Sequence, residues 1–104
     1  MRHTKSMVYN ETIESRELFC YAINNGELYR KTTSPIIENM RKKAKKGIYD
    51  KEKAVDAYYN VATEASKMYE KDFGYRFSVA DRYTAAVDMV EYYEEETLFD
   101  LDNN

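Results

Sequence analysis

The side chains best suited to chemistry in this chain of 104 residues are charged, and they are segregated by sign. Residues 30–53 carry nine basic and three acidic side chains, a net charge of +6, whereas residues 88–104 carry seven acidic side chains and no basic one, a net charge of −7. Opposite charges steer association and select partners. We therefore predict that both segments bind partners, through Arg41, Lys42, Lys43, Lys45 and Lys46 in the basic segment and Glu94, Glu95, Glu96, Leu98, Phe99 and Asp100 in the acidic one.

The basic run also has a purely structural explanation. Residues 41–46 occupy the last two turns of an expected helix that ends before Gly47. Cations at that position interact favourably with the negative end of the helix dipole. Charged side chains on a helical protein also commonly form only its solvated face. Both explanations stay open at this point.

Nucleic acid is the alternative partner for the basic run. Residues 41–46, with Arg30 and Lys31, would contact phosphates, and Tyr29 or Tyr49 would stack on bases. The composition of the whole chain argues against this, because its net charge is −3 and its pI is about 5.2. A dedicated nucleic-acid domain usually has a pI above about 9. We therefore rank a protein partner first.

The acidic end of the chain alternates charged and apolar residues, as in short peptides that dock into hydrophobic grooves. Residues 95–99 resemble the bacterial sliding-clamp-binding motif, with Glu95 in place of its first glutamine, and residues 98–102 resemble a clathrin box. The alternative is that Leu98, Phe99 and Leu101 fold back onto the helices. Both alternatives, a free peptide that binds a partner and a tail that docks onto the helices, stay open at this point.

Catalytic and metal-binding patterns are missing from the sequence. There is one histidine, His3, which we expect to be exposed near the N-terminus, and there is no glycine-rich phosphate loop. Cys20 is the only cysteine, and we expect it to pack as a small hydrophobic residue in a reducing compartment such as the cytosol. No apolar run is long enough to span a membrane. We predict a protein without enzymatic activity, cofactor or metal.

The elements that must position the charged segments are helices, and the longest pattern covers residues 51–73. Asp50 can cap its first turn, and Gly74 can end it in a left-handed conformation. Apolar residues recur at spacings of three and four and so share one face. This stripe, which must be covered by other helices, consists of Ala54, Tyr58, Val61, Ala62, Ala65, Met68 and Tyr69.

Three further helices are expected at residues 12–24, 35–46 and 79–96. Gly26 would stop the first helix, and the segment 32–34 would break the chain before Pro35 starts the second. The last helix has two sets of apolar residues. The second set, Ala85, Met89 and Tyr92, would pack on the first helix or on a partner. The inward faces are predicted to contain Ile13, Leu18, Phe19, Ala22 and Ile23 of the first helix, Ile36, Ile37, Met40 and Ala44 of the second, and Val79, Tyr83, Ala86, Val87, Val90 and Tyr93 of the last.

Length and composition favour one all-α domain, a compact bundle of about four helices. Residues 1–9 would be loose or only partly docked, and residues 97–104 would form an acidic tail. Asp88 lies among residues that we expect to face outward. Tyr59 and Tyr92 would be exposed, and a symmetric homodimer through them is a further hypothesis.

The segment from Leu18 to Gly74 resembles a group of small helical proteins encoded by bacteriophages and related bacterial elements. The resemblance rests on NNGELY, PIIEN, the basic run, GIYD and the long helix ending in FG. It brings no active site. It implies a role in the cytosol of a host bacterium, where such proteins bind and regulate or inhibit complexes of replication, transcription or defence.

Overall fold

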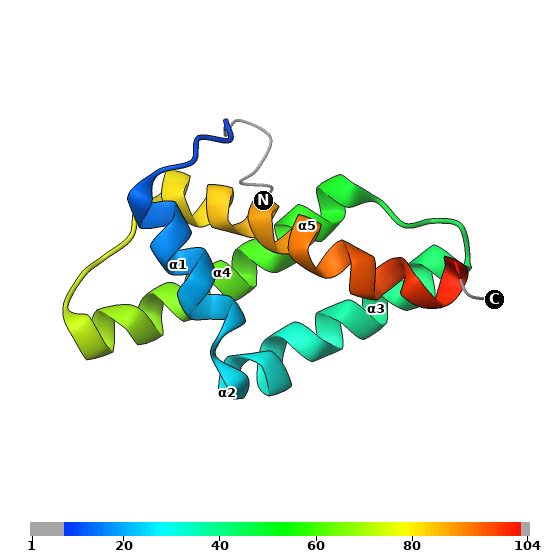
Figure 1. Cartoon of the computed structure of the whole chain (residues 1–104), viewed down its shortest axis with the longest axis horizontal. Coiled ribbons are helices and arrows are strands. Elements are labelled where there is room, and N and C mark those ends of the chain that lie inside the picture. The colour runs from blue at the N-terminus through cyan, green and yellow to red at the C-terminus, as the bar shows by residue number, and fades with distance from the viewer. Residues whose placement is uncertain (1–7, 103–104) are drawn as a thin grey trace.

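The computed structural model describes the backbone of residues 8–102 and the side chains of residues 8–97. No strand occurs among these residues, so the all-α class is confirmed. The four long helices of the predicted bundle are joined by short connections, and a short helix and a π-helical segment precede the second of them (Figure 1). In chain order the elements are α1 (Ile13–Ile23), α2 (Gly26–Leu28), η1 (Tyr29–Thr33), α3 (Ser34–Lys45), α4 (Lys51–Phe73) and α5 (Val79–Asp102).

The long helix α4 begins and ends as its sequence predicts. The Asp50 carboxylate accepts hydrogen bonds from the backbone N–H groups of Glu52 at 2.9 Å and Lys53 at 3.4 Å. Gly74 ends the helix with φ of 74°, a left-handed conformation that glycine adopts without steric cost. The predicted stripe is buried at Ala54, Tyr58, Val61, Ala62 and Ala65 and partly buried at Met68 and Tyr69.

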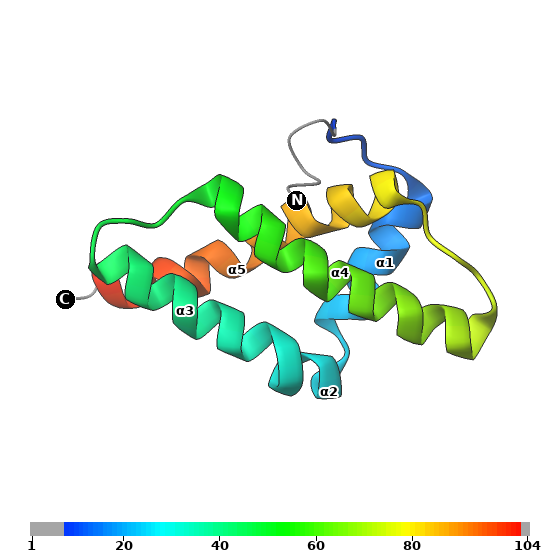
Figure 2. The same ribbon diagram turned by 180° about the vertical axis from the view of Figure 1, so that it is seen from behind.

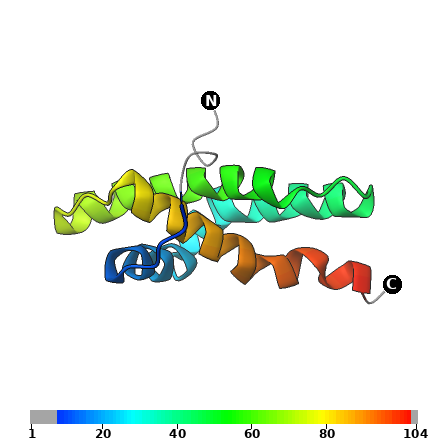
Figure 3. The ribbon, with the colours of Figure 1, turned by 90° about the horizontal axis from the view of Figure 1, so that it is seen from above.

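The last helix, α5, packs against each of the other three long helices. Seen from above, α3 and α4 lie in one layer and α1 in a second, and α5 runs obliquely from the first layer to the second (Figure 3). The second apolar set of α5 takes part in this packing, because Ala85 and Met89 are fully buried. Tyr92 remains half-exposed and meets the edge of the Phe19 ring at 5.7 Å, so the packing that we predicted onto the first helix is confirmed.

The connection between the first two long helices differs from the prediction. Gly26 does not stop α1; the helix ends at Ile23 with Asn24 as its C-cap, and Asn25 caps α2 by accepting a hydrogen bond from Leu28 N–H at 3.0 Å. The chain then stays helical through the segment that we expected to break it. Pro35 follows a π-helical turn in which Ser34 N–H bonds to Tyr29 C=O. A proline ring crowds the carbonyl four residues earlier in an α-helix, and the wider π turn relieves that crowding.

Two residues of α1 that we expected inside are exposed. Ile13 is 86% exposed, and Cys20 is also exposed. The buried side chains of α1 are Ser15, Leu18, Phe19 and Ala22, and at about 100° per residue Ile13 and Cys20 project from the opposite face. The prediction grouped apolar residues by spacing without testing which face carried most of them.

Three further corrections concern α4 and α5. Tyr59 is 9% exposed and Asp88 is 8% exposed, although both were expected outside, while Val79 at the start of α5 is 39% exposed. Tyr59 lies on the edge of the buried face of α4, beside Tyr58 and next to Val55 one turn earlier. Because Tyr59 is buried, the homodimer hypothesis loses one of its two proposed interface residues.

The structure describes part of both ends of the chain. Tyr9 is docked, because its hydroxyl donates a hydrogen bond to Asp88. Helix α5 continues past residue 96 to Asp102, and Thr97 is buried, so the first part of the predicted tail is helical. The predictions for His3 and for the side chains of Leu98, Phe99, Asp100 and Leu101 lie outside the described residues.

Candidate functional site

The two charged segments that we singled out lie beside each other. The C-terminal halves of α3 and α5 meet at one end of the molecule (Figures 1 and 2). Arg41 joins them, because its Nε and Nη2 atoms donate to the Glu96 carbonyl oxygen at 3.3 and 3.1 Å. Its Nη1 atom pairs with Glu38 at 3.3 Å. We call this surface the charged end; it comprises Arg41, Lys42, Lys43, Lys45, Lys46, Glu94, Glu95 and Glu96.

Two tyrosines form hydrogen bonds with carboxylates of α5 at the charged end. Tyr29 donates to the Glu96 carboxylate and Tyr49 donates to the Glu94 carboxylate, both at 3.2 Å. Burial, reinforced by the Glu94 charge, raises the pKa of Tyr49 to about 12. Both tyrosines were candidates for stacking on nucleic-acid bases. Instead their hydroxyls hold α5, and both side chains are partly buried.

The charges that remain available at this end have both signs. Lys42, Lys45 and Lys46 are exposed, and so are Glu95 and Glu96. Lys43 and Glu94 are half-buried. The charged end therefore presents cations and carboxylates on neighbouring helices, and such a surface is complementary to one with its own pattern of charges of both signs.

Sequence reasoning missed a polar cluster around Asp88, near the middle of α5. Asp88 Oδ1 accepts a hydrogen bond from the Tyr9 hydroxyl at 2.9 Å, and Oδ2 lies 3.7 Å from Arg16 Nη1. Burial raises the pKa of the Asp88 carboxyl, while Tyr9 and Arg16 oppose that shift. The available signal was a carboxylate inside an apolar run, directly before the buried Met89.

The same cluster fixes the chain before α1. Asn10 N–H donates to Thr84 Oγ1 at 3.2 Å, and the Thr12 hydroxyl donates to Asp81 at 2.8 Å. Residues 9–12 thus lie along the first turns of α5. These contacts explain the structure of this region without a ligand.

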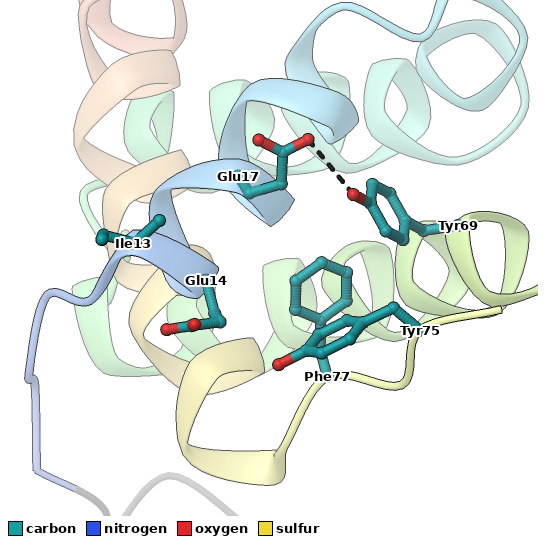
Figure 4. Close-up of a pocket in the computed structure, with 6 residues that line it drawn as sticks. All are labelled: Ile13, Glu14, Glu17, Tyr69, Tyr75 and Phe77. Atoms are coloured by element: carbon teal, nitrogen blue, oxygen red, sulfur yellow. Dashed lines mark hydrogen bonds between the residues drawn. The ribbon is translucent and has the colours of Figure 1, made fainter. Parts of the chain in front are cut away.

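A second feature that sequence reasoning missed is a pocket of about 310 Å³ between α1, the end of α4 and the connection that follows (Figure 4). We call it the aromatic pocket; it is lined by Ile13, Glu14, Glu17, Tyr69, Tyr75 and Phe77. The Tyr69 hydroxyl donates to Glu17 at 3.3 Å across it. The signal available in the sequence was the short aromatic connection that contains Tyr75 and Phe77.

Tyrosine-to-carboxylate hydrogen bonds are common to all these regions. Each joins residues that are far apart in the sequence, so each ties one element to another. Pairs of this kind among the described residues are Tyr9 with Asp88, Tyr21 with Asp72, Tyr29 with Glu96, Tyr49 with Glu94 and Tyr69 with Glu17.

In the part of the chain that the structure describes, no group of three or more histidine, cysteine or acidic side chains is placed to hold a metal ion. Across the same residues, no helix is both long enough and apolar enough to cross a membrane. Comparison of the chain with protein-family models, curated proteins and solved structures gave no match.

Proposed function

We propose that this protein is a non-enzymatic regulator that binds another protein through the charged end. The observation that carries the proposal is the contact between α3 and α5, which brings the basic and acidic segments into one surface. Charges of both signs in a fixed arrangement select a partner by complementarity more than by affinity alone. A binding surface of this kind needs no catalytic residue.

The same contact argues against nucleic acid as the partner. Four cations of the charged end lie on α3 and a fifth, Lys46, caps its C-terminus, and three carboxylates of α5 lie next to them. Carboxylates repel phosphates and reduce the local positive potential on which phosphate binding depends. Tyr29 and Tyr49, which would have stacked on bases, hold α5 in place. Nucleic-acid binding is therefore the second candidate.

The biological setting of the proposal comes from the resemblance to small phage-encoded helical proteins. In that setting the partner is a bacterial protein in a host complex of replication, transcription or defence. The protein would act in the host cytosol by occupying a surface of that complex. This part of the proposal rests on the resemblance alone.

Affinity capture from a bacterial lysate tests the proposal. We expect the tagged chain to retain a specific protein, and we expect the triple variant Lys42→Glu, Lys45→Glu, Lys46→Glu to lose it. The control is the double variant Lys67→Glu, Lys71→Glu, which changes two exposed lysines in the C-terminal part of α4. This control should retain the partner.

Two results would overturn the proposal. A partner that binds both variants equally would place the binding surface away from the charged end. A mobility shift with nucleic acid that weakens steeply with salt, together with no captured protein, would favour the second candidate, because each phosphate contact releases condensed counterions.

A further inference from the structure

We propose that the aromatic pocket binds an arginine side chain of a partner protein. This site is separate from the charged end and does not depend on the function proposed above. The proposal rests on three properties of the pocket: the arrangement of its rings, the sign of its charges and the apolar surface at its rim.

The rings form a corner with faces in different directions. Tyr75 and Phe77 are 4.9 Å apart at an interplanar angle of 76°, and Tyr69 and Phe77 are 4.9 Å apart at 64°. Tyr69 and Tyr75 are 6.5 Å apart at 82°. Phe77 is only 2% exposed and forms the floor, whereas Tyr75 is 45% exposed and forms a wall (Figure 4). The face of an aromatic ring carries negative electrostatic potential, so a cation placed over the half-exposed Tyr75 ring would be attracted to it.

The charged residues that line the pocket are both acidic. Glu14 and Glu17 project from one face of α1 opposite the rings (Figure 4). Glu17 is oriented by the hydrogen bond that it accepts from Tyr69. Among the residues that the structure describes, no lysine or arginine lines the pocket, so a cation that enters would contact two carboxylates and no cationic lining residue.

An arginine fits this combination better than a lysine. Its planar guanidinium stacks on an aromatic face and at the same time donates paired hydrogen bonds to a carboxylate. A lysine ammonium is a strongly hydrated point charge and uses only one of the two features well. The volume of about 310 Å³ is at the small end of ligand pockets, and it suits one long side chain.

The rim of the pocket indicates that the arginine belongs to a protein and is not a free molecule. Ile13 is 86% exposed at the edge of the pocket. Phe73, whose ring lies 4.6 Å from that of Tyr69, is 66% exposed. Apolar side chains beside a pocket would be covered by the residues on either side of a partner's arginine.

The test uses the full chain labelled with ¹⁵N and three small probes: the N-acetyl amides of arginine, lysine and citrulline. We expect arginine amide to give saturable NMR shifts confined to the lining residues. Citrulline amide has nearly the same shape without the charge, and we expect it to bind at least tenfold more weakly. Lysine amide should also bind more weakly than arginine amide.

Variants separate the ring from the charge. Tyr75→Ala should weaken the binding of arginine amide several-fold, and Tyr75→Phe, which keeps the ring, should retain it. Glu14→Gln with Glu17→Gln should also weaken it, whereas Glu27→Gln on α2, an exposed carboxylate elsewhere, should not. Unchanged circular dichroism would show that each variant is folded.

Several outcomes would overturn the inference. They are equal binding of arginine and citrulline amides, equal binding of arginine and lysine amides, shifts outside the pocket, or no saturable shift. Shifts at the pocket that grow with protein concentration before any probe is added would assign it to a second copy of this chain. Because the variant Lys42→Glu, Lys45→Glu, Lys46→Glu should bind arginine amide normally, failure here is distinguishable from failure of the proposed function.

Discussion

The charged end and the aromatic pocket are assembled in different ways. The C-terminal halves of α3 and α5, which carry the charged end, and the connection from α4 to α5, which borders the pocket, lie toward opposite ends of the molecule (Figure 1). The charged end consists of two runs of like charge, each contiguous or nearly so in the sequence. The pocket takes its residues from α1, from α4 and from the connection after α4. A surface made of consecutive residues is visible in composition, whereas a surface made of distant residues becomes visible only when the helices are packed.

The packing of the helices changed the interpretation of the charged end. The sequence offered two separate surfaces, one basic and one acidic, each with its own partner. The Arg41 contact with Glu96 and the Tyr49 contact with Glu94 make them one surface. The charged end can thus be recognised from composition and the pocket cannot. Both nevertheless depend on the packing of the other helices against α4 and α5.

The largest effect should come from breaking that shared support. Ala62 is completely buried on α4, and Ala62→Asp would place an unpaired charge there. An uncompensated buried charge costs roughly 3–5 kcal/mol, a large part of the stability of a small domain. We expect urea unfolding to show a loss of this size, and binding at both ends to be lost together. Glu64→Ala is the control, because Glu64 is exposed and forms an ion pair with the exposed Lys67 at 3.3 Å.

Equal stability of Ala62→Asp and Glu64→Ala would mean that the assigned face of α4 is wrong. Loss of binding at one end with the other intact would also contradict the common support that we describe.

An intermediate effect should distinguish the two ends. Tyr49→Phe removes a partly buried hydrogen bond to Glu94 at the charged end, and bonds to charged groups contribute about 1.5–3 kcal/mol. We expect a loss near the lower figure, about 1.5 kcal/mol, since the site is partly open to solvent. Tyr69→Phe removes the exposed bond to Glu17 at the aromatic pocket and should cost less.

The measurement is the free energy of unfolding of both variants from denaturant titration. Alkaline pH supplies an independent check. The folded pKa of Tyr49, about 12, lies above its ordinary value near 10, so the contribution of Tyr49 is complete below pH 10 and is lost as the pH rises toward 12. The Tyr49→Phe variant should lose less stability over that interval than the wild type. A greater loss from Tyr69→Phe than from Tyr49→Phe would reverse the comparison.

The smallest effect is expected between the two ends, at Asp88. Its folded pKa is raised by burial, so the folded state favours the neutral carboxyl. The wild type should therefore gain stability relative to Asp88→Asn as the pH falls from neutral through the folded pKa toward the ordinary value of about 3.9. Tyr9, Arg16, Glu11 and Glu91 are the other ionisable groups that influence this carboxyl.

Unfolding of both proteins in urea at several pH values between 4 and 7 measures this difference. A difference that stays constant would show that Asp88 titrates normally, and one that moves the other way would show that the Arg16 pair outweighs burial. Arginine-amide binding at the pocket should be unaffected at neutral pH.

The sequence was most informative where one local rule acts alone. Asp50 and Gly74 mark the ends of α4 because capping depends on a few neighbouring residues, and both predictions are confirmed. It was misleading where two faces of a helix compete. Ile13 and Cys20 are apolar and lie at helical spacings, but the buried face of α1 was decided by contacts with α4 and α5.

The candidate sites show the same division. The charged residues of residues 41–46 and 94–96 were identified by composition, and their positions at helix ends followed from the expected helices. Their contact did not follow, because no local rule sets which helices pair. The aromatic pocket was missed for the same reason: Glu14 and Phe77 are near each other only because α1 crosses the end of α4.

The π-helical turn Tyr29–Thr33 has a consequence for the phase of the helical stretch that contains it. Leu28 and Thr33 are both buried, yet residues five apart in an α-helix point about 140° away from each other. The i→i+5 bond from Ser34 to Tyr29 accommodates one residue beyond an α-helical turn and brings the two side chains back toward one face. The π turn therefore shifts by one residue the helical phase of the side chains that follow it. As a result, Leu28 before the turn and Ile37 and Met40 after it pack into the same core.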